Sequence, residues 1–254
     1  MDHKNVVPGV HEVNGINVVN GITETIRIIE ITEKLNFGML LALVGGIMDV
    51  YSFIVRGNVF ATGQTGNFVL AAVRLAEQDY TGLLHAVTPI AAFWAGIFTV
   101  RHLFYSYFQQ KHLLWKRWVL AASAAALFAS GLIPGNYPNL MANTLVSFAA
   151  ALQYCAFRKF GETENYASVF CTGNMRSCAE NFYKGIAKKD RQSLKKALSY
   201  SYILISFFAG AIAGALSVNF LHERTIWLAA VVLLAALALS LAPAGILSKQ
   251  KLST

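Results

Sequence analysis

The chain has 254 residues, of which 56% are hydrophobic and only 13% are charged, and its mean hydropathy is +0.49. Soluble domains carry about 25% charged residues, so this composition excludes an ordinary soluble protein despite the formal net charge of +8. The three cysteines follow neither CxxC nor metal-ligand spacing, so the sequence predicts no disulfide framework, no metal site and no cofactor.

Residues 1–36 form a polar N-terminal segment. Its first 20 residues lack a basic start followed by an apolar core, so no cleavable signal peptide is expected. Ile22, Ile26 and Ile29 alternate with charged residues, a pattern that favours a short amphipathic helix at the membrane surface. Because isoleucine is β-branched, a strand or the absence of fixed structure stays open for this segment.

Apolar stretches fill most of the remaining chain. Each is close to the roughly 20 residues that a bilayer-spanning helix requires. The sequence therefore predicts an all-α polytopic membrane protein with six transmembrane helices, over residues 37–55, 84–108, 118–134, 140–157, 197–220 and 226–246. Residues 247–254 would form a tail.

Basic residues predict the orientation of these helices. If the chain crosses the bilayer six times, eighteen Lys and Arg side chains lie on one side. The other three, Arg56, Arg74 and Arg224, lie on the opposite side. Cytoplasmic loops are rich in Lys and Arg, so both termini are predicted to be cytoplasmic.

The same distribution of charge decides how residues 58–76 are interpreted. If this stretch crossed the bilayer, every later loop would change sides and the basic loops would no longer share one side. We therefore expect a re-entrant or broken segment, in which an extended piece ends at Asn67 and a half-helix covers residues 68–76.

An internal repeat accompanies this interruption. Thr65-Gly-Asn67 recurs as Thr172-Gly-Asn174, and two further short matches follow in the same order at near-constant separation. Each unit, residues 37–134 and 139–246, holds three predicted spans, an odd number that inverts the second copy relative to the first. Inverted repeats with broken helices near the midplane are a recurring plan of secondary transporters.

The same residues carry a family resemblance. Gly45-Gly-Ile-Met-Asp49, followed by Phe60-Ala-Thr-Gly-Gln-Thr-Gly-Asn67 and a second TG-containing segment, resembles the YoaK-like family of bacterial integral membrane proteins over about residues 37–246. The resemblance implies a six-helix protein of the bacterial inner (plasma) membrane and no settled activity. The second break departs from the family pattern, because Met175-Arg-Ser-Cys178 and Glu180-Asn181 are unusually polar.

Asp49 is the acidic residue placed well inside a predicted span. Such a carboxylate is costly in a bilayer and usually faces an interior partner or cavity, so it is a candidate proton- or cation-coupling group, with a structural ion pair or helix cap as the alternative. The two breaks would aim helix N-termini at a polar or anionic solute, or would merely cap a tight bend. The candidate solute site comprises Asp49, Gln64, Thr65, Gly66, Asn67, Gln153, Thr172, Gly173 and Asn174.

These features favour a secondary transporter of a small solute over an enzyme, since no catalytic motif is present. A channel or passive facilitator and a structural or partner-binding membrane protein remain alternatives. The basic run Lys184–Lys196 is expected to meet anionic lipid headgroups, not nucleic acid, because no aromatic interleaving accompanies it. Small-residue helix faces leave a homo-oligomer open.

Overall fold

The computed structural model describes residues 16–19, 22–25, 31–160 and 164–241. Helices dominate the described residues. Their bounds are η1 Ile31–Glu33, α1 Leu35–Val55, α2 Gln64–Ala76, α3 Tyr80–Leu103, η2 Phe104–Phe108, α4 His112–Leu132, α5 Asn139–Ala156, α6 Thr172–Ala187, α7 Arg191–Leu221, η3 His222–Thr225 and α8 Ile226–Leu241.

Two short antiparallel hairpins complete the described secondary structure. β1 (Ile16–Val19) pairs with β2 (Ile22–Thr25), and β3 (Lys159–Phe160) pairs with β4 (Glu164–Asn165). Over Ile22–Thr25 the chain is therefore a strand and not the surface helix that the pattern favours, as its β-branched residues allow. Residues 26–30 of that predicted helix and the tail at 247–254 lie outside the described residues.

Three helical stretches are long and apolar enough to cross a bilayer, counted over the described residues: Leu35–Val55, Tyr80–Phe108 and Arg191–Leu241. The last stretch contains both α7 and α8, which the single 3-10 turn η3 separates. The helix ends lie within a few residues of the predicted ones at most positions. The largest differences are at the starts of α4 and α7, which each begin six residues early.

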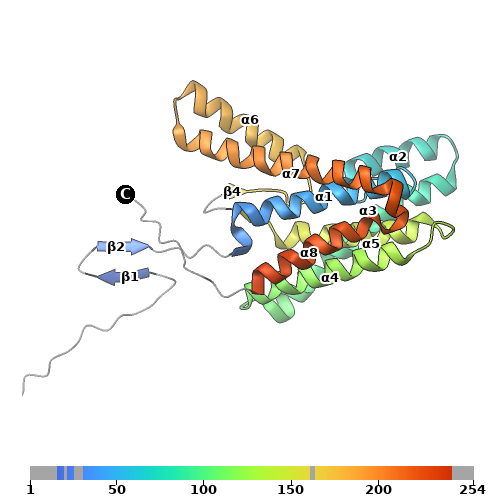
Figure 1. The fold of residues 1–254 in the computed structure, drawn as a ribbon, viewed down its shortest axis with the longest axis horizontal. Helices are drawn as coiled ribbons and strands as arrows, with labels where there is room; N and C mark the ends of the chain where they lie inside the picture. Colours follow the sequence, from blue (N-terminus) through green and yellow to red (C-terminus); the bar gives the residue numbers. More distant parts are fainter. Residues whose placement is uncertain (1–15, 20–21, 26–30, 161–163, 242–254) are drawn as a thin grey trace, which may run out of the picture.

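The helices form one elongated bundle in which α1 lies centrally (Figure 1). α1 packs most extensively against α7, and α3 packs most extensively against α5. The first contact depends on glycine, because a Cβ on Gly46 would collide with the backbone of Phe207 and Ala211, and one on Gly210 with the carbonyl of Leu43. Such close backbone approach through small residues is typical of helix contacts in membranes.

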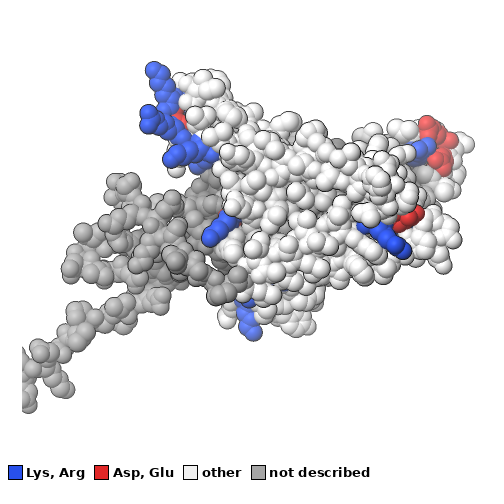
Figure 2. Space-filling view, viewed as in Figure 1, with Lys and Arg blue, Asp and Glu red and all other residues white. Residues whose placement is uncertain are grey.

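The two ends of the bundle differ in charge. We call the end at which α1 and α4 begin and α5 ends the basic end, and the opposite end the far end. In the space-filling view, blue Lys and Arg atoms dominate one end, whereas blue and red atoms lie together at the other (Figure 2). α6 and the first turns of α7 form a hairpin that stands out from the bundle at the basic end (Figure 1).

Asp190 begins α7 at the exposed turn of that hairpin. Ser193 Oγ donates to its carboxylate over 2.6 Å and the Gln192 backbone N–H over 2.9 Å. These two hydrogen bonds lower the pKa of the Asp190 carboxyl below its usual range. The charged cap therefore helps to define where α7 begins at neutral pH.

Candidate functional site

The first interruption follows α1 and runs back into the bundle. Gly57 and Asn58 have positive φ angles of 89° and 59°, which lets the chain reverse directly after the helix. The returning chain reaches Asp49, where the backbone N–H and the Oγ–H of Thr62 both donate to Oδ1, over 3.1 and 2.7 Å. Asp49 lies seven residues before Arg56, so the chain re-enters by about 10 Å along α1.

The re-entrant piece is also tied to two helices by hydroxyl groups. The Ala61 N–H donates to Ser52 Oγ on α1 over 3.0 Å, and Ser147 Oγ on α5 donates to the Ala61 carbonyl over 2.7 Å. Ala61 and Thr62 are fully buried. Irregular backbone at membrane depth must be satisfied by protein groups, and these contacts do so.

Asn67 clamps the same piece from the first turn of α2. Its amide accepts from the Phe60 N–H over 3.1 Å and donates to the Phe60 carbonyl over 2.7 Å, while the side chain is fully buried. We expected an extended piece up to Asn67 and a half-helix after it. α2 instead begins at Gln64, because the buried amide pairs with the backbone seven residues earlier and does not cap the helix.

The second interruption, between α5 and α6, contains an equivalent clamp. Asn174 is buried, accepts from the Ala167 N–H over 3.0 Å and donates to the Ala167 carbonyl over 2.9 Å, again seven residues earlier. It also donates to the Phe170 carbonyl over 2.8 Å. The two TGN segments therefore share one structural role in the described structure.

Both interruptions reach neighbouring positions on α1. Val169 lies against Gly45, where an added Cβ would come within 2.9 Å of its Cα, and Thr62 binds Asp49 one turn further along. Four residues of helix span about 6 Å. The two breaks therefore converge beside Asp49, which is half-buried.

Some of the remaining predicted site residues are exposed at helix starts, and others contact residues of the first break. Thr65, Thr172 and Gly173 are exposed at the starts of α2 and α6, and a Cβ on Gly173 would meet nothing within 4 Å, whereas one on Gly66 would touch the Phe60 ring. Gln64 accepts from Asn67 over 3.1 Å and donates to the Ala61 carbonyl. These contacts occupy Gln64 within the first break.

Gln153 is fully buried on α5. Its Nε2 lies 3.9 Å from Met48 Sδ and 3.4 Å from the Ala149 carbonyl, while Oε1 has no hydrogen-bond partner among the described residues. Met48 precedes Asp49, so the Gln153 amide lies near the convergence of the two breaks. Gln64 and Gln153, both predicted members of the solute site, therefore belong to separate sets of hydrogen bonds.

Arg56 is a residue of the first break that sequence reasoning assigned only to an external loop. It is fully buried at the end of α1, where Nε donates to Tyr51 Oη over 2.7 Å and Nη2 donates to the Ile133 carbonyl at the end of α4. Asn143 on α5 donates to the Arg56 carbonyl over 2.8 Å. Its position directly before Gly57-Asn58 was the signal that could have distinguished it from a solvated loop arginine.

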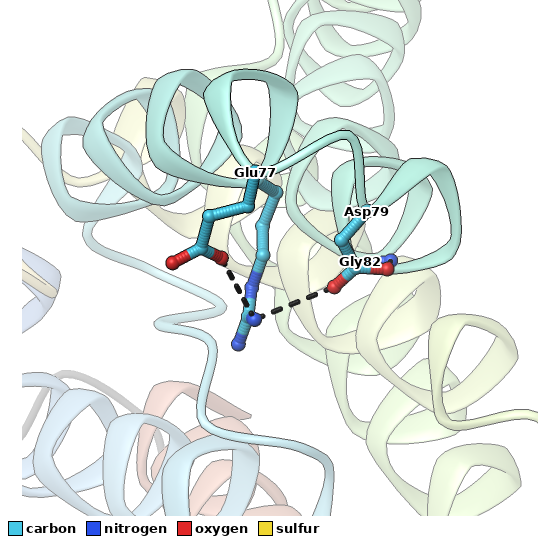
Figure 3. A network of polar contacts seen from close by, with 4 residues as sticks. Glu77, Asp79 and Gly82 are labelled. Carbon is cyan, nitrogen blue, oxygen red and sulfur yellow. Dashed lines mark hydrogen bonds and ion pairs between the residues drawn. The ribbon is translucent and has the colours of Figure 1, made fainter.

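A polar cluster links the end of α2 to the start of α3 at the far end of the bundle. Arg74 Nη1 lies 3.4 Å from Glu77 Oε2 and 3.3 Å from Asp79 Oδ2, and the other Asp79 oxygen accepts from the Gly82 N–H (Figure 3). Arg74 also lines a cavity of about 250 Å³ together with Asn58, His85 and Asn139. Val59 of the re-entrant piece also lines this cavity.

No group of three His, Cys, Asp or Glu side chains suited to a metal ion occurs in the part of the chain that the structure describes. The candidate site is therefore built from one carboxylate, buried amides, hydroxyl groups and helix N-termini.

Comparison with known proteins identifies the family. A family model described as "Protein of unknown function (DUF1275)" matches residues 37–239, which is most of the chain. The chain belongs to this family. It is 25% identical over 199 residues to the UPF0700 transmembrane protein YoaK of Bacillus subtilis (strain 168), a match that covers 74% of this chain and 85% of that protein. No solved structure matches the chain.

The resemblance to the YoaK-like family is thereby confirmed. The matched region contains almost all of α1 and of α8 and both interruptions between them, so membership concerns the whole helical bundle. The chain is a membrane protein of a family without an assigned function.

Proposed function

We propose that this protein is a secondary transporter of a small polar or anionic solute across the bacterial inner membrane, with proton coupling through Asp49. It would cross the bilayer six times, through α1, α3, α4, α5, α7 and α8, while α2 and α6 are half-helices. The observation that carries the proposal is the convergence of two re-entrant pieces beside one half-buried carboxylate. Discontinuous helices that meet at mid-depth are the usual setting of transporter sites.

The packing supports two inverted halves, residues 37–134 and 139–246. If α1 to α4 correspond to α5 to α8, the extensive α1–α7 contact corresponds to the α5–α3 contact, and α2–α3 corresponds to α6–α7. The clamps Asn67–Phe60 and Asn174–Ala167 correspond in the same way. α2 runs toward the far end and α6 toward the basic end, as inversion requires (Figure 1).

Charge supports the orientation. Lys and Arg residues gather at the basic end, so this end is proposed to face the cytoplasm with both termini. The α6–α7 hairpin, with Lys184–Lys196 at its turn, would then contact anionic headgroups of the inner leaflet. We propose neither a catalytic activity nor nucleic-acid binding, and a homo-oligomer stays an open alternative.

Proton-coupled flux in reconstituted vesicles tests the proposal. Vesicles holding a pH-sensitive dye would be exposed to a panel of amino acids, carboxylates and polar uncharged solutes. A carrier is expected to move protons with at least one solute, and Asp49→Asn to abolish that movement while Glu77→Gln, which removes an exposed carboxylate, leaves it intact. Solute flux that ignores a proton gradient would instead indicate a channel, and no flux with any solute would favour a structural role.

A further inference from the structure

A second polar cavity lies at the basic end, away from Asp49. Two overlapping hollows of about 370 and 350 Å³, which together we name the basic basin, share six lining residues: His112, Lys116, Cys155, Ala156, Arg158 and Lys159. Arg101, Phe104 and Trp115 line the second hollow as well. Each volume falls within the range of about 300–1,000 Å³ that is usual for ligand sites.

Cations from three separate elements line the basin. Arg101 comes from α3, Lys116 from α4, and Arg158 and Lys159 from the segment after α5. Lys116 pairs with Glu33 over 3.2 Å and donates to Thr32 Oγ1. In contrast, none of Arg101, Arg158 and Lys159 forms a salt bridge with a described residue.

The second hollow brings these three cations together. Arg101 and Arg158 both line the second hollow together with Cys155, which lines the first hollow too. Like charges that converge in a concave site repel one another and attract an anion more strongly than charges spread over a convex surface do. The basin therefore differs from the lysine-rich turn of the α6–α7 hairpin.

The wall of the basin is aromatic. The ring of Phe104 lies 5.7 Å from that of buried Trp115 and 5.6 Å from that of His112, measured between centroids. An apolar wall reduces hydration beside the cations, which strengthens their interaction with a bound anion. Arginine guanidinium groups match the geometry of phosphate oxygens.

We propose that the basic basin binds a phosphate group. This ligand could be the headgroup of an anionic phospholipid or a soluble phosphate ester, and the two share the chemistry that the basin recognises. The proposal does not depend on the transport function, because the basin uses none of the residues at the convergence of the two breaks.

Binding to the full chain distinguishes the two sources. The protein would be purified in a neutral detergent and titrated with pyrophosphate, and in parallel placed in nanodiscs containing phosphatidylglycerol or only phosphatidylcholine, with bound lipid counted by native mass spectrometry. Binding of pyrophosphate without selective retention of phosphatidylglycerol identifies a soluble phosphate compound as the ligand class. Retention of phosphatidylglycerol without pyrophosphate binding identifies a lipid headgroup.

Matched charge variants test whether the basin is the site. Arg158→Gln combined with Lys159→Gln is expected to weaken binding at least about tenfold, and Arg101→Gln, on another helix, to weaken it in the same direction. The control, Lys188→Gln combined with Lys189→Gln, removes the same charge from the α6–α7 turn and should leave binding unchanged. Equal losses in basin and control variants, or no binding of either probe to the unmodified protein, would overturn the proposal.

Discussion

The two interruptions of the bundle use the same clamp but differ in what surrounds it. Asn67 and Asn174 each close a seven-residue loop by pairing with one backbone N–H and one carbonyl. In the segment before α2, Thr62 donates to the carboxylate of Asp49. Among the described residues, the segment before α6 donates no hydrogen bond to a carboxylate. The asparagine clamp stabilises both breaks, and the hydrogen bonds between Thr62 and Asp49 make the first break chemically different from the second.

This difference changes how the candidate site is understood. Asp49 already serves as a hydrogen-bond acceptor for the first break, so its charge is part of the structure as well as a candidate for coupling. The start of α6, by contrast, has open space at Gly173. A solute would therefore meet different groups on the two sides of the convergence.

The largest expected effect comes from removing the shared clamp. Asn67→Ala and Asn174→Ala each leave at least two partly buried backbone groups without their side-chain partner, so we expect each to lower the free energy of unfolding by roughly 2–6 kcal/mol. Thermal and denaturant unfolding in detergent would measure it. Thr65→Ala and Thr172→Ala, at exposed neighbouring positions, serve as controls and should change it by less than about 0.5 kcal/mol. A clear loss at only one asparagine would break the equivalence.

Arg56 lies at the start of the first break, where its side chain is fully buried. Arg56→Gln removes the donors to the Ser130 and Ile133 carbonyls at the end of α4, so we expect a loss of roughly 2–4 kcal/mol in the free energy of unfolding. Exposed Arg224, which contacts the ring of Trp227, provides the matched control as Arg224→Gln. Equal effects of the two substitutions would show that burial of Arg56 contributes nothing.

Substitutions of Asp49 test the hydrogen bonds to Thr62, which only the first break has. Asp49→Ala removes the acceptor of both Thr62 donors and is expected to cost about 1–3 kcal/mol in the free energy of unfolding. Asp49→Asn keeps an oxygen in place and should cost less than half as much, although it removes the charge. If both substitutions lowered stability equally, the charge itself and not the hydrogen bonds would hold the first break.

The smallest effects are expected at the glycines of the two TGN segments. Gly173→Ala adds a methyl group in open space near the start of a helix and should stabilise the protein by about 0.5–1 kcal/mol, because alanine is the better helix former. Gly66→Ala places its Cβ 3.1 Å from the Phe60 ring, so this gain is offset. Unfolding temperatures of the two variants would give the difference, and a larger gain for Gly66→Ala would reverse the comparison.

Much of the helical framework could be predicted because it depends on local properties. Apolar stretches of near-bilayer length predicted the positions of the long helices. The N-terminal prediction was less accurate, since Ile22–Thr25 satisfies both a helical and a strand pattern and pairs as a strand. The start of α2 was misplaced by four residues because Asn67 was interpreted as a cap.

The sequence by itself determined that this protein belongs in a membrane, where its helices lie, and that two related TGN segments interrupt them, since composition, hydropathy and repetition are all properties of the chain alone. Only the tertiary structure decided what those segments do. The partners of Asn67, Asn174, Asp49 and Arg56 are fixed by how the chain returns beside α1, and the residues of the basic basin come together from three elements far apart in the chain. Hydrogen bonds and charge interactions act over a few ångströms in space, and no pattern along the chain specifies which distant groups come that close.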